Sequence, residues 1–372
     1  MIFGVNALRL SGQRLGIGRY VEYLLKYWDS MLAADEHVVV YVREPFDKNE
    51  LGLSDAFDVK LLPSRLNGVW WENAVLARHA RKTDVLFNPS YTIPLWFRGR
   101  NVVATHSVNE AERGTHPWWY HLTYRQRNQL CARLADAVIV PSETTKEHVQ
   151  RLYSVKPEKI TIVAEGAPNS FAPIDDEAVL SETRRRYLGD DSPYVLFVGK
   201  QSQRRNIPAL IEAFARVKRS NGIPHKLLLF GPNVLGLPLE ELAGRFGVAD
   251  SVVQTDGRLA RHEDILPVYS GADLFVHPTA AEGFSLTIVE AMACALPVIT
   301  VGRGAVAEIV DGAAITVDAP TPAELEAAIR RVLTDAALSA ELRERALERS
   351  WTFRLEATAR GTLDVMRQVA AG

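Results

Sequence analysis

The sequence predicts an α/β protein built from two doubly wound, Rossmann-like domains. Three observations lead to this prediction. The chain has 372 residues, enough for two domains of ordinary size. Short apolar runs rich in Val, Ile, Leu and Phe alternate with longer stretches of helical periodicity, which is the pattern of β-α-β units on a parallel sheet. The alternation stops after Gly166 and then starts again, so the pattern occurs twice.

The first domain is predicted for residues 1–170. Its apolar runs are closed by turn residues and are expected to be buried strands at 2–8, 37–43, 84–88, 101–106, 137–141 and 160–164. Helical periodicity is found between most of these runs, at 18–32, 69–81, 120–134 and 142–153. We therefore expect six parallel strands joined by right-handed helical crossovers.

The second domain is predicted for residues 171–350, after a linker near 166–192. Strands are expected at 194–198, 226–230, 251–254, 274–277, 297–301 and 314–317, and helices at 206–219, 240–246, 263–270, 286–295 and 323–334. A last segment, 351–372, contains a predicted helix at 351–369 that packs toward the first domain. Because ligands gather at the carboxyl ends of parallel strands, we expect the two domains to face each other across a cleft.

Composition excludes several classes of protein. Apolar residues make up 47% of the chain, and 43 basic against 45 acidic residues leave a net charge of −2, so disorder and a strongly basic nucleic-acid binder are unlikely outcomes. The two cysteines, Cys131 and Cys294, lie far apart and predict neither a disulfide framework nor a structural zinc site. No run of 18 apolar residues appears, and the N-terminus has the pattern of a strand. We expect a cytoplasmic protein, with contact at the inner face of a membrane left open.

A helix that begins near Ser285 is predicted to bind an anion. Ser285 is a good N-cap, and capping leaves the backbone N–H groups of Leu286 and Thr287 without carbonyl partners in the helix. This end carries the positive pole of the helix dipole and suits a diphosphate. Glu282 lies in the preceding loop and Glu290 lies about one turn into the helix, so we expect them to have different partners. The alternative is a capped surface helix with two solvated glutamates.

The segment EGFSLTIVEAMACALPVI, which begins at Glu282, resembles the signature of the family-4 retaining glycosyltransferases. That signature has two glutamates separated by seven residues, and Glu282 and Glu290 match this spacing. The resemblance implies that Glu290 holds the ribose hydroxyls of a nucleotide, and that Glu282 is a catalytic residue at the donor-sugar hydroxyls near the anomeric carbon. The donor-binding residues that it implies in this segment are Gly283, Phe284, Ser285, Leu286, Thr287 and Glu290.

A second segment, FVGKQSQRRNIPALIEAFARVK at 197–218, is similar to the family's strand, glycine, basic loop and helix. It adds Gly199 to the expected donor-binding residues. Lys200 and Arg205 lie at a strand end beside the predicted N-cap Asn206, where two cations can neutralise a leaving diphosphate, as a metal does elsewhere. The family usually has Arg at the position of Lys200 and Lys at that of Arg205. The arginine, which can bind a phosphate through two N–H groups, therefore stands at position 205 in this chain instead of position 200. The alternative for this loop is a basic, solvated surface.

Further similarity in the family's order covers most of the chain and implies the GT-B fold. It is found at GIGRYVEYLL (16–25), DAVIVPSETTKEHV (136–149), KPEKITIVAEGAP (156–168) and GADLFVHPTAAEGF (271–284). One departure is Glu165-Gly166, where members often carry Asn-Gly.

Two glycines and a histidine of the first domain complete the predicted site. Gly16 and Gly18 open the first long helix, where glycine lets the backbone approach a donor phosphate; a tight turn is the alternative. Val21 stands where a nicotinamide fingerprint needs a third glycine. His106 ends a strand, where a ring nitrogen can reach a substrate hydroxyl or the donor sugar, and the family has a histidine near its reaction centre. The alternative is a structural histidine.

Aromatic and basic residues of the first domain raise the question of the acceptor. Trp70, Trp71 and the stretch HPWWYHLTY (116–124) have side chains that stack on sugars and anchor at membrane interfaces, although core packing is expected for most of them. A basic group at a predicted helix end suits either C-terminal capping, which we favour, or anionic lipid; its members are Arg78, His79, Arg81 and Lys82.

The resemblance therefore implies a metal-independent, retaining hexosyltransferase that moves a hexosyl group from a nucleotide-diphosphate sugar, UDP- or GDP-linked, to an acceptor hydroxyl. No Asp-x-Asp sequence is present, and no metal or other cofactor is expected. The expected acceptor is a sugar, a lipid-linked sugar or a small molecule, in glycoconjugate or cell-envelope polysaccharide or glycolipid synthesis, without nucleic acid. The alternatives are a sugar-nucleotide epimerase or phosphorylase of the same fold, and a non-catalytic nucleotide-sugar-binding protein. A nicotinamide oxidoreductase is the weakest of the alternatives.

Overall fold

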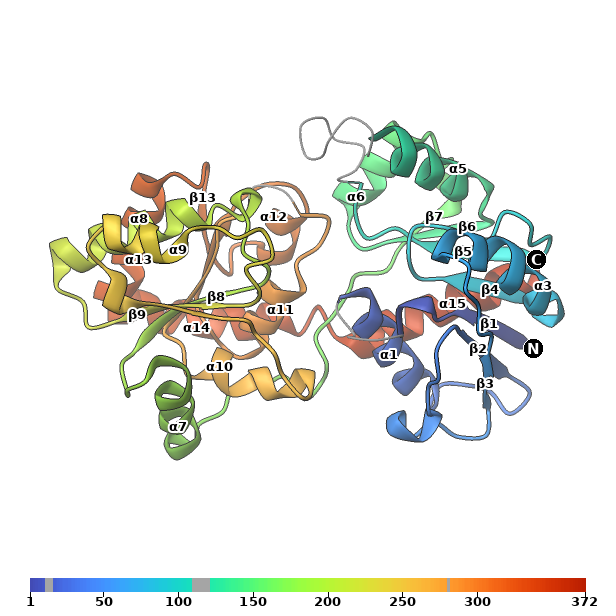
Figure 1. Cartoon of the computed structure of the whole chain (residues 1–372), viewed down its shortest axis with the longest axis horizontal. Coiled ribbons are helices and arrows are strands. Elements are labelled where there is room, and N and C mark those ends of the chain that lie inside the picture. Colours follow the sequence, from blue (N-terminus) through green and yellow to red (C-terminus); the bar gives the residue numbers. More distant parts are fainter. Residues whose placement is uncertain (11–15, 109–120, 280–281) are drawn as a thin grey trace. The chain divides into compact units, whose positions relative to one another are not determined.

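The computed structural model divides into two compact units, drawn in Figure 1, each with its own parallel sheet. It describes residues 1–10, 16–108, 121–279 and 282–372. Unit 1 comprises Met1–Gly166 and Leu355–Gly372, and unit 2 comprises Ala167–Arg354. Each unit is described by itself below.

The sheet of unit 1 has seven parallel strands in the order β3-β2-β1-β4-β5-β6-β7. Their bounds are β1 (Ile2–Asn6), β2 (His37–Val42), β3 (Phe57–Leu61), β4 (Val85–Asn88), β5 (Arg100–Ala104), β6 (Ala137–Val140) and β7 (Ile160–Ile162). The prediction of six strands missed β3. This strand forms the edge of the sheet and buries only Phe57, so its sequence FDVKL lacks the apolar run of an inner strand.

Helices cover both faces of this sheet. These helices are α1 (Ile17–Trp28), α2 (Gly68–Trp70), α3 (Ala77–His79), α5 (Gln126–Leu134), α6 (Glu143–His148) and α15 (Leu355–Ala371), with π-helical turns at Trp71–Leu76, His121–Arg125 and Val149–Tyr153. Short 3-10 helices lie at Leu8–Leu10, Lys48–Leu51, Ala80–Lys82 and Pro157–Lys159. Along β2, Val38 and Val40 pack with α1 and α15, whereas Val39 and Tyr41 pack with the helical segment at 68–82. Successive side chains of a strand point to opposite faces of the sheet, so unit 1 has a hydrophobic core on each face.

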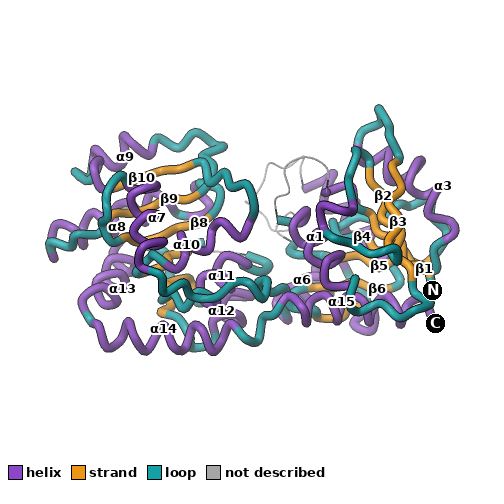
Figure 2. The backbone as a smooth tube through the Cα atoms, turned by 90° about the horizontal axis from the view of Figure 1, so that it is seen from below, coloured by secondary structure: helices purple, strands orange, loops and turns teal. Residues whose placement is uncertain are grey.

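The C-terminal helix α15 belongs to unit 1 although it follows unit 2 in sequence. Ala359, Leu363 and Met366 are fully buried in the core of unit 1. The indole Nε1 of Trp28 on α1 donates a hydrogen bond to the carbonyl oxygen of Ala359 at 2.8 Å. Figure 2 shows α15 beneath strands of unit 1.

The sheet of unit 2 has six parallel strands in the order β10-β9-β8-β11-β12-β13. Their bounds are β8 (Tyr194–Val198), β9 (Lys226–Phe230), β10 (Val252–Thr255), β11 (Leu274–His277), β12 (Val298–Val301) and β13 (Ile315–Val317). All six predicted strands of this half are present, each within one residue of the predicted bounds at either end.

The helices of unit 2 include three that the sequence did not predict. They are α7 (Glu177–Leu188), α8 (Ile207–Asn221), α9 (Leu239–Arg245), α10 (Leu266–Ser270), α11 (Leu286–Ala293), α12 (Gly304–Val310), α13 (Pro322–Thr334) and α14 (Ala336–Ser350), with 3-10 helices at Gln203–Arg205, Ala249–Ser251 and His262–Ile265. The predicted linker at 166–192 contains α7, which was missed because it is highly charged and buries only Leu180, Thr183 and Leu188. Helices α12 and α14 were also missed.

Candidate active site

In unit 2 the strand order reverses at β8, which pairs with β9 on one side and with β11 on the other. Ligands of doubly wound sheets bind at such a switch point, beyond the carboxyl ends of the strands. The segment after β8 carries the predicted residues Gly199, Lys200 and Arg205, and the segment after β11 carries Glu282 and the start of α11. The structure therefore brings both predicted segments of this half to the same edge of one sheet.

The turn after β8 packs a cation against backbone. Gly199 has a φ of +135°, a conformation that favours glycine, and a Cβ there would overlap Nη1 of Arg205. Burial lowers the pKa of Arg205, and the neighbouring Glu282 offsets this only in part. Lys200, the other predicted cation, is exposed to solvent. The two cations thus differ: Arg205 is fixed beside the turn, whereas Lys200 is solvated.

Glu282 lies within ion-pair distance of two arginines and a histidine. Its Oε1 is 3.6 Å from an Nη2 of Arg204, 3.7 Å from Nη2 of Arg205 and 3.9 Å from Nε2 of His277. Arg204 was not predicted as a site residue, although its place in the basic loop beside Arg205 was a signal. The positive charges of Arg204 and Arg205 beside this carboxylate favour an anionic ligand at this edge.

Buried polar atoms without hydrogen-bond partners gather at this edge. Among the described residues, five buried side-chain atoms lack a partner, and four of them are Oε1 of Gln201, Nδ1 of His277, Oγ1 of Thr279 and Oε1 of Glu282. All four belong to the segments that follow β8 and β11 or to the end of β11 itself. Leaving a buried polar group unpaired costs about 1–3 kcal/mol, so such a cluster indicates a surface shaped for polar ligand groups.

His277 is a neutral imidazole in this environment. Burial, followed by the charges of Arg205 and Arg204, lowers its pKa to about 3. Its ring lies between those of Phe197 and Phe275, with centroid distances of 6.2 and 6.0 Å. His277 was predicted only as a strand end, because nothing in the local sequence shows that it lies beside Glu282.

The N-terminus of α11 differs from the prediction at Ser285. Ser285 occupies the N-cap, but its side chain makes no capping hydrogen bond, and its Oγ instead lies 3.4 Å from Nε2 of His277. The first helical bonds run from the amides of Ile288 and Val289 to the carbonyl of Ser285. In the described part of the chain, the amides of Leu286 and Thr287 have no carbonyl partner. Gly283 and Phe284 immediately precede this turn, and Phe284 packs against Phe353 at 5.8 Å.

Glu290 is buried, so the alternative of a solvated surface glutamate is wrong for this residue. Its Oε1 accepts a hydrogen bond from Nε2 of His262 at 2.7 Å, and its Oε2 accepts one from the hydroxyl of Tyr269 at 2.9 Å. The ring of His262 also packs against Phe171 at 5.4 Å. The sequence missed His262 and Tyr269, since they lie 28 and 21 residues from Glu290 and on other elements. The carboxylate is therefore oriented by two side chains.

In unit 1, His106 has both ring nitrogens engaged. Nδ1 lies 2.6 Å from Oε1 of Glu165, and Nε2 lies 2.8 Å from the carbonyl oxygen of Pro89. The expectation of a ring nitrogen free to reach a substrate is therefore not met in this conformation. Burial favours the neutral ring, but Glu165 and the Pro89 carbonyl outweigh it and raise the pKa of His106 above its ordinary value. The rings of Tyr20 and Tyr91 pack edge-on against the imidazole.

The remaining predicted glycines lie at the start of α1. Gly16 is the N-cap of α1 with a φ of +38°, and Gly18 is buried in its first turn. Gly16 has space around it, because a Cβ there would meet no atom within 4 Å. The positive φ accounts for glycine at position 16 as a turn residue, which is the alternative that the sequence left open.

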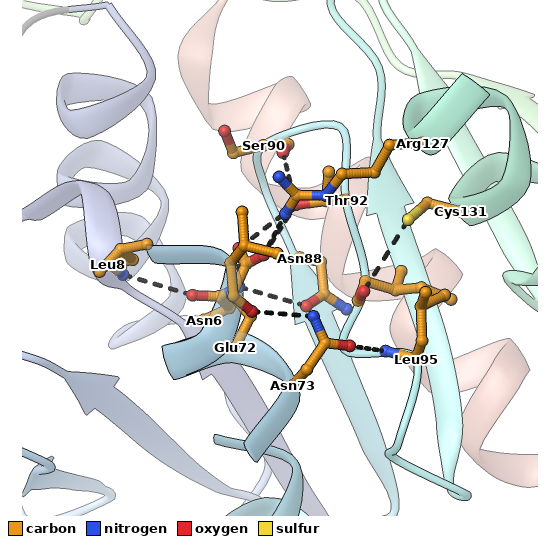
Figure 3. A network of polar contacts seen from close by, with 12 residues as sticks. Asn6, Leu8, Glu72, Asn73, Asn88, Ser90, Thr92, Leu95, Arg127 and Cys131 are labelled. Carbon is orange, nitrogen blue, oxygen red and sulfur yellow. Dashed lines mark hydrogen bonds and ion pairs between the residues drawn. The ribbon is translucent and has the colours of Figure 1, made fainter. Parts of the chain in front are cut away.

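A buried polar network lies at the corresponding switch point of unit 1, between β1 and β4 (Figure 3), and the sequence analysis did not predict it. Glu72 accepts hydrogen bonds from Asn6 at 3.2 Å and from Thr92 at 3.1 Å, and it forms an ion pair with Arg127 at 2.7 Å. Burial raises the pKa of Glu72, although Arg127 opposes this. Asn88 joins the network through Asn6 at 3.4 Å. Here the polar groups satisfy one another, unlike those of unit 2.

The predicted aromatic residues separate into different environments. Trp71 is fully buried and donates a hydrogen bond from Nε1 to the carbonyl of Leu62 at 2.8 Å, whereas Trp70 is exposed. Residues 116–120 of the aromatic stretch lie outside the described residues. Within the described ranges, no group of three or more His, Cys, Asp and Glu side chains could hold a metal ion. No described helix is long and apolar enough to cross a membrane.

Two family models match the chain. The model "Glycosyltransferase Family 4" matches residues 15–169, and the model "Glycosyl transferases group 1" matches residues 192–335. The first match covers the sheet of unit 1 except β1, and the second covers the sheet of unit 2 and contains both segments of its switch point.

Curated relatives are similar over part or most of the chain. Alpha-D-kanosaminyltransferase of Streptomyces kanamyceticus is 30% identical over 219 residues, which are 58% of this chain and 55% of the relative. D-inositol 3-phosphate glycosyltransferase of Segniliparus rotundus is 27% identical over 332 residues, 85% of this chain and 71% of the relative. The match thus spans only about half the length of the first of these relatives.

Solved structures are similar over nearly the whole chain. Sucrose-phosphate synthase from Thermosynechococcus elongatus has a TM-score of 0.79 at 22% identity and covers 100% of this chain and 99% of its own. Anabaena HepE in complex with UDP-glucose has a TM-score of 0.78 at 18% identity and covers 99% of both chains. At these identities the likeness concerns the fold.

Proposed function

The chain belongs to glycosyltransferase family 4 and has the two parallel-sheet domains of the GT-B fold, and from this premise we propose that it is a retaining, metal-independent hexosyltransferase. It moves a hexosyl group from a nucleoside-diphosphate sugar, UDP- or GDP-linked, to an acceptor hydroxyl. The acceptor belongs to glycoconjugate or cell-envelope polysaccharide or glycolipid synthesis, on the cytoplasmic side. In the transfer, the bond between the anomeric carbon and the diphosphate oxygen breaks, the acceptor oxygen bonds to that carbon, and the hydroxyl proton is released.

The observation that carries this proposal is the combination of unpaired polar atoms and excess positive charge at one edge of unit 2. Four buried, unpaired atoms lie in the segments around β8 and β11, and Arg204 and Arg205 lie within 4 Å of Glu282. A nucleoside-diphosphate sugar supplies what such an edge lacks, since it carries anionic phosphates together with hydroxyl groups that donate and accept hydrogen bonds.

Negative charge gathers on the diphosphate as the sugar becomes oxocarbenium-like, so stabilising the leaving group is expected to be the largest catalytic effect. Arg205 and Lys200 supply positive charge. The amides of Leu286 and Thr287, which have no carbonyl partner among the described residues, supply oriented donors at the N-terminus of α11. Because Gly199 has no side chain, the guanidinium of Arg205 can lie directly against the turn. Together these groups perform the charge neutralisation that a metal ion performs in other transferases.

The two glutamates have separate roles in this proposal. Glu290 holds the ribose hydroxyls, with its carboxylate oriented by His262 and Tyr269. Glu282 accepts hydroxyls of the donor sugar near the anomeric carbon. In this proposal His106 of unit 1 is a catalytic residue, and Gly16 and Gly18 bind the donor.

The test is a melting experiment on the full chain with UDP, GDP, ADP and dTDP and their common sugar conjugates, with and without EDTA. A ligand at about 100 times its Kd stabilises the protein by about 2.7 kcal/mol. We expect a clear shift with one base, equal in EDTA, reduced in Glu290→Gln and retained in Glu240→Gln, whose glutamate is exposed at the start of α9. No shift with any nucleotide would contradict the donor site, and a shift that EDTA removes would contradict metal independence.

The configuration of the product tests retention. With the donor identified by melting, transfer to sugar acceptors is followed by NMR, and the anomeric coupling constant of the new bond is compared with that of the donor. Retention is expected. An inverted product would contradict the proposal, and sugar phosphate or epimer formed without an acceptor would favour the phosphorylase or epimerase alternative.

A further inference from the structure

Five exposed apolar side chains of unit 1 form a surface that the proposed function does not use. We call it the tryptophan patch. Its members are Leu66, Val69, Trp70, Leu95 and Trp96, which are between 41% and 58% exposed. They come from two segments, one before and at the start of the helix at 68–82 and the other in the loop between β4 and β5.

Side-chain contacts join the two segments into one surface. The rings of Trp70 and Trp96 meet edge to face, with centroids 5.8 Å apart and an interplanar angle of 61°. Asn73 connects the same segments through its side chain, since Oδ1 accepts a hydrogen bond from the amide of Leu95 at 2.7 Å and Nδ2 donates one to the carbonyl of Val69 at 2.8 Å. The backbone beneath the patch is therefore fixed.

Core packing does not account for the patch. Trp71, Leu76 and Ala77 already form the buried side of the helical segment at 68–82, which packs against the sheet. Trp70 and Trp96 lie outside this core, and each exposes about half of a large apolar ring to water. Contiguous exposed apolar surface of this kind is characteristic of interaction sites.

The surroundings of the patch are basic. Residues 59–108 contain seven Lys and Arg residues but only two acidic residues, Glu72 and Asp84. Glu72 is buried and paired with Arg127, so it does not offset the charge at the surface. Arg65 and Arg98 are exposed and lie one and two residues from Leu66 and Trp96. A partner of negative charge is therefore favoured.

The polar side chains beside the patch argue against a sugar. Sugar sites combine an aromatic face with polar side chains that bond hydroxyl groups. Here Asn67 accepts from the amide of Trp70 at 3.1 Å, and Asn73 bonds the backbone of Val69 and Leu95. The oxygens of both side chains, and Nδ2 of Asn73, are thereby bonded to backbone groups. What the surface offers is two indoles, aliphatic side chains and flanking arginines, which is the composition of a membrane-interface anchor.

We propose that the tryptophan patch docks unit 1 on an anionic lipid bilayer, with Trp70 and Trp96 at the headgroup level and Arg65 and Arg98 against lipid phosphates. The predicted basic group at the end of the same helical segment is exposed and adds to the attraction; its members are Arg78, His79, Arg81 and Lys82. This docking does not depend on glycosyl transfer, so it can be tested and can fail independently of the proposed activity.

The test is co-sedimentation of the full chain with vesicles of phosphatidylcholine mixed with phosphatidylglycerol, and with vesicles of phosphatidylcholine alone. We expect binding to the anionic vesicles that weakens with salt. The double variant Trp70→Ala/Trp96→Ala should lose most of the binding. Arg65→Gln/Arg98→Gln should bind about 30-fold more weakly, because each cation near an anionic surface contributes roughly a fivefold gain in binding.

The matched control is Trp351→Ala, since Trp351 is 57% exposed but lies in unit 2. It should bind anionic vesicles as the unchanged chain does. Circular dichroism and melting should show that all variants fold, because every altered side chain is exposed. Absence of vesicle binding by the unchanged chain, or unaltered binding by both double variants, would overturn the proposal. So would quenching of tryptophan fluorescence by oligosaccharides, lost in Trp70→Ala/Trp96→Ala, without a response to vesicles.

Discussion

At the scale of single residues, the two glutamates of the signature differ in what surrounds them. Oε1 of Glu282 has no hydrogen-bond partner and lies 3.6 to 3.7 Å from two arginines, whereas both oxygens of Glu290 accept hydrogen bonds from His262 and Tyr269. An unpaired carboxylate oxygen is free to accept a sugar hydroxyl. A carboxylate held by two donors has a fixed orientation, which suits binding more than reaction.

This difference predicts different kinetic effects. Glu282→Gln should lower kcat about 100-fold or more while nucleotide affinity changes little, because its contacts matter most as charge develops. Glu290→Gln should weaken nucleotide binding and should lower kcat to a smaller extent. Steady-state kinetics together with calorimetric titration of the nucleotide measure both quantities. Equal loss of kcat and affinity in Glu282→Gln would contradict the division of roles.

His106 gives a prediction about protonation. Its two nitrogens face two acceptors, and only the imidazolium has two N–H groups to donate. The pKa of His106 is raised in the folded chain, against the effect of burial, by Glu165 and the Pro89 carbonyl. Its stabilising effect is therefore fully present below the pKa of the unfolded chain and is lost as pH rises through the folded pKa.

Glu165→Gln should accordingly lower the pKa of His106. Nitrogen NMR shifts of the imidazole, followed against pH, measure this directly. The loss of stability in Glu165→Gln should be largest at acidic pH and should shrink as pH rises above the folded pKa. A ring that is neutral at pH 6 in the unchanged chain would refute the assignment. Glu165→Asp, which keeps the charge, should restore most of the shift.

At the scale of elements, the network around Glu72 joins four pieces of unit 1. Asn6 ends β1, Asn88 ends β4, Glu72 lies in the π-helical turn at Trp71–Leu76 and Arg127 lies on α5. The contacts of Glu72 tie the turn and α5 to the strand ends (Figure 3). The sequence predicted helical periodicity at 69–81, and it did not predict the π-helical turn within this segment.

Glu72→Ala should destabilise unit 1 by about 2 kcal/mol, because Asn6 and Thr92 each lose a buried acceptor and Arg127 loses its ion pair. Denaturant unfolding measures the change. The matched control is Glu143→Ala, whose glutamate is largely exposed at the start of α6 and should cost less than about 0.5 kcal/mol. In Glu72→Ala/Arg127→Ala, the two effects should not add, and strict additivity would contradict the coupling.

At the scale of the whole molecule, the chain leaves unit 1 at Gly166 and returns to it at Leu355. Unit 1 therefore depends on the last 18 residues for part of its core. Leu363→Ala should cost about 2–5 kcal/mol, with the loss of hydrogen-exchange protection concentrated in unit 1. Leu134→Ala, at a leucine that is 56% exposed, is the control and should cost little. Loss of protection concentrated in unit 2 would contradict this assignment.

The local pattern of apolar residues was sufficient to predict most of the strands and helices. A buried strand such as β8, with all five residues buried, must be apolar throughout, so its sequence YVLFV identifies it. The same rule explains the failures. Edge strand β3 buries one residue, and α7 buries little of its length, so neither has an apolar pattern that sequence can detect.

The sequence by itself determined the repeated β-α-β order, the two glutamates at their spacing and the basic loop, because these depend on the burial of neighbouring residues and on positions within one segment. Only the tertiary structure decided that His262 and Tyr269 hold Glu290, that Arg204 and His277 lie beside Glu282, and that Glu165 engages His106. The physical reason is strand order. The pairing of β8 with β11, and of β5 with β6 and β6 with β7, brings together loops distant in sequence, and local periodicity carries no record of such pairing.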